Sequence, residues 1–196
     1  MQRAMRPGSW SPFTAVEHFA IGSRPGFVWD ARIRIAPLVV ARVRDSYLDG
    51  EGAMFGKIDA LIPVVHQHGT PEMASGGLLR YLAEAVWTPT ALLPESGVHW
   101  EAIDDSSARA TLTSSTTSVA MNVYFGPMGE ITRIAAQRYR VESGKAILTP
   151  WIGHFDDYAR TDGMMVSLSA EVGWVLPSGW FPYWRGRTVR VIFDTM

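Results

Sequence analysis

One charged pair in this sequence stands at helical spacing beside aromatic side chains. Arg80, Glu84 and Trp87 occupy positions i, i+4 and i+7 of a segment whose apolar residues repeat with a helical period, and Tyr81 adjoins the pair. In an apolar cavity Arg80 would hold an anionic ligand group and Glu84 would act as general acid or base. On a solvated helix face the same two residues would form an ion pair worth roughly 0.3 kcal/mol. We favour the ion pair slightly and keep both interpretations.

A second cluster combines a histidine, two carboxylates and a tyrosine in five residues. His154, Asp156, Asp157 and Tyr158 follow closely on Trp151. A His–Asp dyad with a tyrosine donor can run acid–base chemistry without a cofactor. The interpretation we favour is a turn in which the aspartates accept hydrogen bonds from loop amides. If the protein is an enzyme, the predicted catalytic residues are Glu84, His154 and Asp157.

Metal and nucleophile motifs are weak in this chain. His66 and His68 would share a face of a strand, with His154, Asp156 or Glu72 as a third ligand. No H-E-x-x-H motif or second matching pair supports such a site, so we predict loop histidines without a metal. A G-x-S-x-G elbow and a phosphate-binding glycine loop are also missing from the sequence. We therefore predict neither a metal ion nor a cofactor.

Composition narrows the class of protein. Apolar residues make up 47% of the 196 residues, which is enough for a sizeable core. The 18 basic and 19 acidic residues leave a net charge of -1, which argues against nucleic acid as a partner and gives no bulk attraction to anionic membranes. The absence of cysteine excludes disulfides and thiolate metal sites. Eight tryptophans, eight phenylalanines and six tyrosines must fill a core or line an apolar pocket.

Alternating apolar and polar residues predict strands along most of the chain. The first half is expected to hold strands at 13–21, 27–35, 39–46 and 53–65, with a hairpin turn at Asp49-Gly50. One helix is expected at 72–88, with Thr70 as N-cap, a proline at its first position and a firm start near Leu78 after two glycines. The strands expected in the second half are 99–103, 108–113, 117–125, 130–140, 146–155, 164–176 and 181–193.

These elements predict one α+β domain over residues 1–196 that is predominantly antiparallel β. We expect a strongly curved sheet, a half-barrel or open barrel, with the 72–88 helix on its concave side. The N-terminal stretch has no apolar core of a secretory signal, and no apolar run is long enough for a transmembrane segment. As written, the chain is predicted to be cytoplasmic, with an upstream anchor or signal left open.

Several stretches of the sequence resemble a bacterial family of unknown function. The matching segments are WSPFTAVEHF, GFVWDARI, LLRYLAEAVWTPTALLP, VHWEAIDDSSARATL and FPYWRGR, in this order along nearly the whole chain. The resemblance implies a fold similar to the lipoprotein-carrier half-barrels, in which helices cover the open side of a bent sheet. It also implies that family members extend further upstream. No activity comes with the resemblance, because a fold does not fix a function.

The predicted function is binding of a hydrophobic small molecule or lipid in an aromatic-lined cavity on the concave face. The alternative is a cofactor-independent isomerase, lyase or hydrolase that acts on an apolar substrate in the same cavity. A structural or interaction module would result if the protein's own side chains fill that cavity. Oligomeric state and ligand identity stay open. The predicted ligand-binding residues are basic and aromatic: Arg80, Tyr81, Trp87, Trp29, Trp100, Arg138, Trp151, Tyr158, Tyr183 and Trp184.

Overall fold

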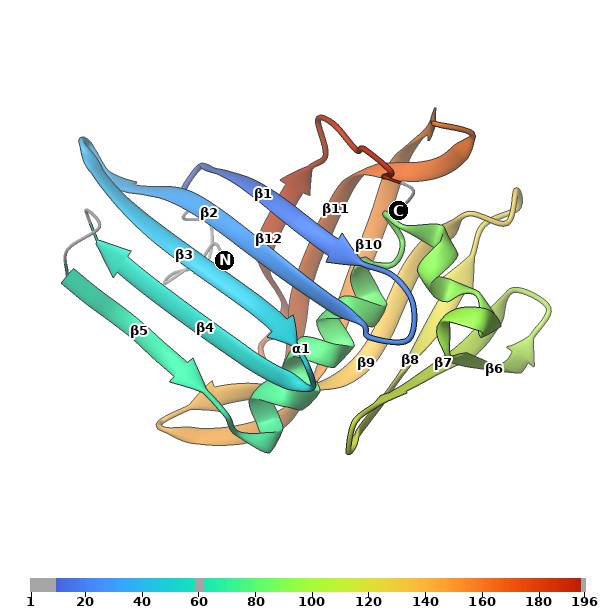
Figure 1. Cartoon of the computed structure of the whole chain (residues 1–196), viewed down its shortest axis with the longest axis horizontal. Coiled ribbons are helices and arrows are strands. Elements are labelled where there is room, and N and C mark those ends of the chain that lie inside the picture. Colours follow the sequence, from blue (N-terminus) through green and yellow to red (C-terminus); the bar gives the residue numbers. More distant parts are fainter. Residues whose placement is uncertain (1–9, 59–61, 195–196) are drawn as a thin grey trace.

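Two antiparallel sheets lie on either side of one α-helix (Figure 1). The computed structural model describes residues 10–58 and 62–194. The first sheet has the order β1-β2-β3-β4-β5, so each strand pairs with its neighbour in sequence. Its strands are β1 (Phe13–Ala20), β2 (Gly26–Ala36), β3 (Val39–Leu48), β4 (Glu51–Ile58) and β5 (Ile62–His68).

The second sheet is a seven-stranded meander with the order β12-β11-β10-β9-β8-β7-β6. Between the sheets in sequence come helix α1 (Pro71–Glu84) and two 3-10 turns, η1 (Pro89–Leu92) and η2 (Pro94–Ser96). The strands of this sheet are β6 (Val98–Asp104), β7 (Ser107–Ser114), β8 (Thr117–Phe125), β9 (Ile131–Glu142), β10 (Lys145–Thr161), β11 (Met164–Leu176) and β12 (Gly179–Arg187).

The start of α1 follows the sequence prediction closely. The Thr70 hydroxyl accepts a hydrogen bond from the Met73 backbone N–H at 3.2 Å, and Pro71 occupies the first position. The expected late start at Leu78 is wrong, because the helix is regular through its two glycines. Gly77 is required there, since a side chain at this position would press on the ring of Tyr47.

The end of α1 comes earlier than predicted. The helix stops at Glu84 and the chain turns through η1 and η2, so the expected end at residue 88 is four residues too late. Beyond Glu84 the backbone hydrogen bonds tighten to i+3 spacing: the Trp87 N–H donates to the Glu84 carbonyl at 2.9 Å and the Thr88 N–H to the Ala85 carbonyl at 3.1 Å. No helix in the described residues is long and apolar enough to cross a membrane.

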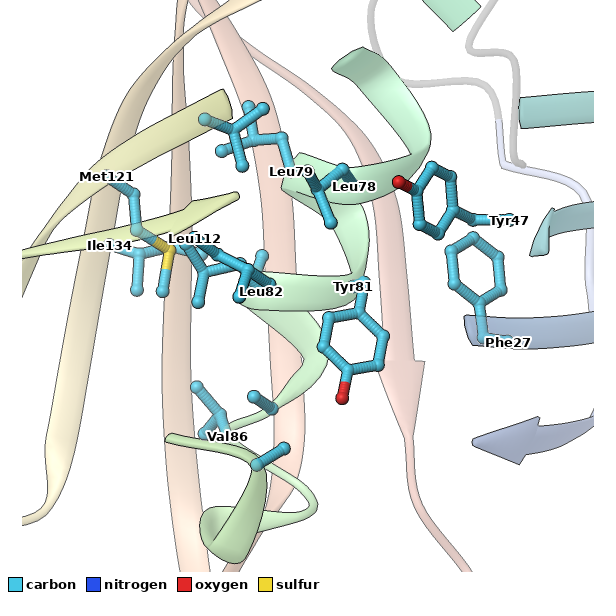
Figure 2. Packing of buried hydrophobic residues seen from close by; sticks show 14 of the residues in the cluster. Phe27, Tyr47, Leu78, Leu79, Tyr81, Leu82, Val86, Leu112, Met121 and Ile134 are labelled. Carbon is cyan, nitrogen blue, oxygen red and sulfur yellow. The ribbon is translucent and has the colours of Figure 1, made fainter. Parts of the chain in front are cut away.

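Buried side chains of the two sheets pack against opposite sides of α1 (Figure 2). Leu82 packs toward Leu112 and Met121 of the second sheet, while Tyr81 lies on the side of the first sheet with Phe27. The helix backbone also lies directly on β4: a side chain at Gly52 would overlap the carbonyl of Met73. Helix α1 is therefore the common support of both sheets.

The structure confirms a mostly antiparallel β fold with one main helix and changes its assembly. The single curved sheet predicted from sequence is divided in two, because α1 lies between β5 and β6 in sequence and these strands do not pair. Among the strands of the described residues, neither sheet closes on itself. The strand expected over 53–65 is two strands, β4 and β5, and residues 59–61 lie outside the described ones. The last strand ends at Arg187 instead of residue 193.

Candidate functional site

A cavity of about 70 Å³ lies between α1 and the inner faces of both sheets. That space holds several water molecules and is smaller than the roughly 300–1,000 Å³ of pockets that enclose drug-sized ligands. Charged and aromatic side chains dominate its wall. The lining residues are Trp29, Val43, Asp45, Met54, Arg80, Ala83, Glu84, Trp87, Arg138, Trp151, Phe155, Val172, Tyr183 and Trp184.

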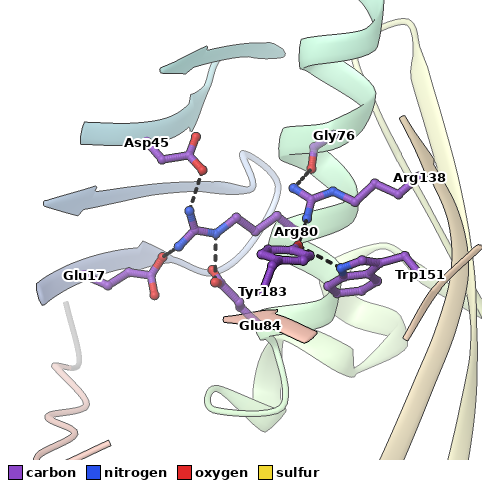
Figure 3. A network of polar contacts seen from close by, with 8 residues as sticks. All are labelled: Glu17, Asp45, Gly76, Arg80, Glu84, Arg138, Trp151 and Tyr183. Atoms are coloured by element: carbon purple, nitrogen blue, oxygen red, sulfur yellow. Dashed lines mark hydrogen bonds and ion pairs between the residues drawn. The ribbon is translucent and has the colours of Figure 1, made fainter. Parts of the chain in front are cut away.

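On the side of the first sheet, three carboxylates surround the guanidinium of Arg80 (Figure 3). Glu17 of β1, Trp29 of β2 and Asp45 of β3 are register neighbours across three strands, which places both carboxylates beside the indole. Arg80 donates to Asp45 Oδ2 at 2.5 Å and to Glu17 Oε1 at 3.2 Å. It also donates to Glu84 Oε1, one helical turn away, at 2.8 Å. Helix and sheet thus meet through one cation.

The pKa values in this acid cluster follow from burial and charge. Burial and the nearby carboxylate of Glu84 raise the pKa of Glu17 well above its usual range, although Arg80 lowers it. Burial alone would lower the pKa of Arg80, but the carboxylates of Glu84, Asp45 and Glu17 outweigh it and raise that pKa. Glu84 Oε2 is buried and, among the described residues, has no hydrogen-bond donor as long as Glu17 is ionised. A protonated Glu17 can donate to Glu84, because two carboxyl groups hydrogen-bond only when one carries a proton.

On the side of the second sheet, Arg138 of β9 points back toward α1 (Figure 3). Its guanidinium donates to the Tyr183 hydroxyl at 3.2 Å and to the Gly76 carbonyl at 3.3 Å, and it lies 5.3 Å from the ring centre of Trp151. In the described part of the chain, no carboxylate lies within 4.0 Å of the Arg138 guanidinium nitrogens. Arg138 is therefore a cation at the cavity wall that lacks an acidic partner.

Tyr183 of β12 links this cation to the aromatic wall. Its oxygen accepts hydrogen bonds from Arg138 and, at 2.8 Å, from the indole N–H of Trp151. Two donors occupy the oxygen, so the phenolic proton points away from both of them. The ring of Trp174, which pairs with Trp151 across β10 and β11, stacks on Tyr183 at 5.5 Å. This packing fixes the hydroxyl beside Arg138.

The rest of the wall is aromatic. Trp87, just beyond α1, meets Phe155 of β10 edge to face at 5.8 Å and Trp184 of β12 at 6.3 Å. Its indole N–H is buried and without an acceptor in the described residues. Buried indole nitrogens usually find a partner, so this donor is an unused polar group next to the cavity.

Three predicted ligand-binding residues lie outside the cavity lining. Tyr81 is buried and stacks on Phe19 at 4.3 Å, and burial raises its pKa to about 12. The Trp100 indole donates to the Leu92 carbonyl at 2.9 Å, and the Tyr158 hydroxyl donates to a backbone carbonyl of β9 at 2.6 Å. These contacts are structural.

The predicted His154–Asp157 dyad does not reach the cavity. His154 is exposed on β10 and points away from its buried neighbours Trp151 and Phe155, because alternate residues of a strand face opposite sides. Asp157 has a φ of 57° at an irregularity in β10 and pairs with Arg187 at 2.6 Å. The turn favoured for this segment is also wrong, because residues 145–161 form one strand.

His66 and His68 are on β5, not in the predicted loop. Their rings lie 5.1 Å apart on one face of the strand, beside Phe55 of β4. Among the described residues, no group of three His, Cys, Asp or Glu side chains could hold a metal ion. The two imidazoles and the phenyl ring form an exposed aromatic cluster.

Glu17 and Asp45 are the site residues that the sequence analysis missed. Each carries its carboxylate on the apolar side of an alternating strand: Glu17 shares its face with Phe13 and Phe19, and Asp45 shares its face with Val43. A charge in the buried register of a strand needs a partner from another element. That register is the signal that could have identified both residues.

A second hollow opens where two strands of the second sheet diverge. β8 and β9 pair only between Asn122–Phe125 and Ile131–Ala135. Beyond this stretch a space of about 440 Å³ lies between the strands, above Ser75 and Leu79 of α1. Trp151 borders both this hollow and the inter-sheet cavity.

Comparison with known proteins gives a family and no activity. Residues 1–193 match the family of unknown function (DUF6920). No curated protein and no solved structure has significant similarity to the chain. The sequence motifs had indicated a family without an established activity, and this match agrees with that prediction. Since the match extends over nearly the whole chain, the protein belongs to this family of unknown function.

Proposed function

We propose that the protein binds an amphipathic small molecule or lipid with an anionic head group in the cavity between its two sheets. The observation that carries this proposal is Arg138, a guanidinium at an aromatic wall with no carboxylate within ion-pair distance in the described residues. A carboxylate or phosphate would complete the hydrogen bonds of Arg138 and accept the free proton of Tyr183.

The sequence predicts that Arg80 and Arg138 both hold the ligand, but the two arginines have different partners in the structure. Arg80 is already bonded to three carboxylates, so an anionic ligand would meet repulsion there. We therefore assign the head group to Arg138 and Tyr183 and the apolar part to Trp87, Trp151 and the neighbouring aromatic wall. The likeness to lipoprotein-carrier half-barrels and a cytoplasmic location stay predictions.

The cavity must widen to accept such a ligand. In the described residues no strand of the first sheet pairs with a strand of the second, so the sheets are joined mainly through α1 and side-chain packing. Separating the sheets breaks no backbone ladder, and the apolar part of the ligand would cover the aromatic side chains that the separation exposes. Binding of a chain longer than the present cavity is therefore expected to open the two sheets.

Dodecanoate and dodecanol are matched probes for this proposal, because they differ only in the head group. Calorimetry should show that the wild type binds dodecanoate more tightly than dodecanol. Arg138→Met should weaken dodecanoate binding by on the order of tenfold or more, because a charge-assisted hydrogen bond is lost. Dodecanol should bind both proteins equally. Arg160→Met, at an exposed position on β10 that lines neither the cavity nor the second hollow, is the control. Equal affinity of the wild type for both probes would contradict the proposal.

An enzyme in the same cavity is the second candidate, and Glu84 supports it. Its carboxyl group lies at the cavity wall, and Glu17 beside it is held toward its protonated form, so the two carboxyl groups could exchange a proton. His154 and Asp157 play no part in this version. Native mass spectrometry of the purified protein identifies a copurified ligand, and Glu84→Gln separates the two candidates. In both cases Glu84→Gln should still bind that compound. Only an enzyme would turn the compound over, and its Glu84→Gln variant should lose this turnover.

A further inference from the structure

The outer face of the first sheet carries like charges in direct register. Arg32 of β2 pairs with Arg42 of β3, and Arg42 pairs with Lys57 of β4, so three cations adjoin across three strands. All three side chains are exposed. Like charges directly opposite each other destabilise a sheet, so the folded state gains nothing from this arrangement.

Two further arginines extend this basic face, which we define as Arg32, Arg34, Arg42, Arg44 and Lys57. Within residues 10–58 and 62–194, only Arg44 of the five has a carboxylate within ion-pair distance; it forms a bidentate pair with Asp30 at 2.8 and 2.9 Å. The net charge of the whole chain, -1, conceals this local excess of cations.

An exposed apolar tip lies at one end of the basic face. The turn between β2 and β3 is at the end of the sheet remote from α1 (Figure 1). Leu38 in this turn is 99% exposed, and Ile35 just before it is 46% exposed. Leu38 also has a φ of 65°, a left-handed conformation that disfavours leucine and suits glycine or asparagine. Neither packing nor turn geometry explains a leucine at this position.

We propose that the basic face and its apolar tip dock on an anionic lipid bilayer. Leu38 and Ile35 would enter the interfacial region, and the arginines and Lys57 would contact lipid phosphates. Peripheral membrane binding combines inserted apolar side chains with cations near the headgroups, and this end of the sheet presents both. A nucleic acid would use the cations and leave the apolar tip in water. The docking surface faces away from the cavity, so it does not depend on the proposed ligand.

Vesicle flotation tests the electrostatic half of the proposal. The wild type should bind vesicles of equimolar phosphatidylcholine and phosphatidylglycerol, bind pure phosphatidylcholine far more weakly, and detach at high salt. Replacing Arg42 and Lys57 together by glutamine should weaken binding roughly 30-fold, at about one kcal/mol for each cation. Arg109→Gln, an exposed position on the other sheet, should leave binding unchanged.

Leu38→Gly tests the apolar half without harming the fold. Glycine accepts the left-handed turn, so thermal stability should hold or rise, whereas vesicle binding should fall roughly tenfold through the lost apolar contact. Met128→Ser removes another strongly exposed apolar side chain, 82% accessible, from a turn of the second sheet and should have no effect.

Two results would overturn the proposal. The first is failure of the wild type to bind the phosphatidylglycerol vesicles at low salt. The second is a pair of observations: Leu38→Gly leaves vesicle binding unchanged, and a single-stranded RNA competes with the vesicles for the basic face. The partner of this face would then be a nucleic acid. Neither result concerns dodecanoate binding, so this surface and the cavity are judged separately.

Discussion

On the inner face of the first sheet acidic side chains outnumber basic ones, whereas the outer face of the same sheet has an excess of cations. Inside, Glu17 and Asp45 flank Trp29 and reach one arginine from α1. Outside, the basic face contains only one arginine that pairs with a carboxylate in the described residues. On β3, for example, Arg44 lies on the hydrated outer face and the next residue, Asp45, lies on the buried inner face.

The difference lies in how each face compensates its charge. The inner carboxylates are removed from water, so they need the cation of Arg80 and a proton on Glu17. The outer cations stay hydrated, so water and salt moderate their repulsion and the cost to folding is small. We expect mutations inside to act on stability, and mutations outside to act on binding.

The largest effect is expected from Arg80→Met. This change leaves three carboxylates without their cation, and loss of one partner from a buried ionic network costs about 3–5 kcal/mol. Urea unfolding at neutral pH measures the loss. Arg80→Lys, which keeps the charge but not the three-way geometry, should recover part of it. A loss below about 1 kcal/mol for Arg80→Met would show that water, not the arginine, solvates this cluster.

The sequence could predict the elements better than their assembly. Strand alternation and the Thr70-Pro71 helix start are local signals, so most strands and the beginning of α1 follow from them. The division into two sheets depends on which distant strands pair, and local periodicity says nothing about that. The end of α1 lies earlier than Pro89 predicts, because the chain already leaves the α-helix in the turn before this proline.

The candidate site was predictable where residue type and register agreed. Residue type alone predicts Trp29 and Arg138 as site residues, and both line the cavity. Neighbours in sequence predict His154 as a site residue, but it lies three residues from Trp151 on the same strand and therefore faces the other way. Glu17 and Asp45 belong to the apolar register of their strands, and only their distant partner Arg80 explains them.

Glu17→Gln should give the next largest effect, and its sign depends on pH. The folded-state pKa of Glu17 is raised above its unfolded value, so native protein binds more protons between the two values. Wild-type stability should therefore fall as pH rises through the folded-state pKa. Glutamine cannot ionise, so Glu17→Gln should be the more stable protein above that pKa. Unfolding curves from pH 4 to 9 measure the difference, and identical pH profiles would contradict a protonated Glu17.

A smaller effect of opposite kind is expected on the outer face. Arg42→Gln removes the central cation between Arg32 and Lys57, so it should stabilise the fold by up to about 1 kcal/mol at low salt. Salt screens the repulsion, and the gain should disappear at high ionic strength. Denaturation at both salt concentrations provides the measurement. A loss of stability at low salt would mean that Arg42 packs on the sheet instead of repelling its neighbours.

The smallest effect is expected from Asp30→Asn, which breaks the exposed pair with Arg44. This pair has bidentate geometry, yet both side chains are about half exposed, so solvent screening limits its contribution to about 0.5 kcal/mol or less. The Arg44 hydrogen bond lowers the pKa of Asp30, so the small contribution is present above the unfolded pKa and is lost as pH falls through the lower folded value. Asp30→Asn also increases the net positive charge of the basic face. Stability should therefore hardly change while binding to phosphatidylglycerol vesicles becomes tighter, and weaker binding would contradict the charge assigned to this face.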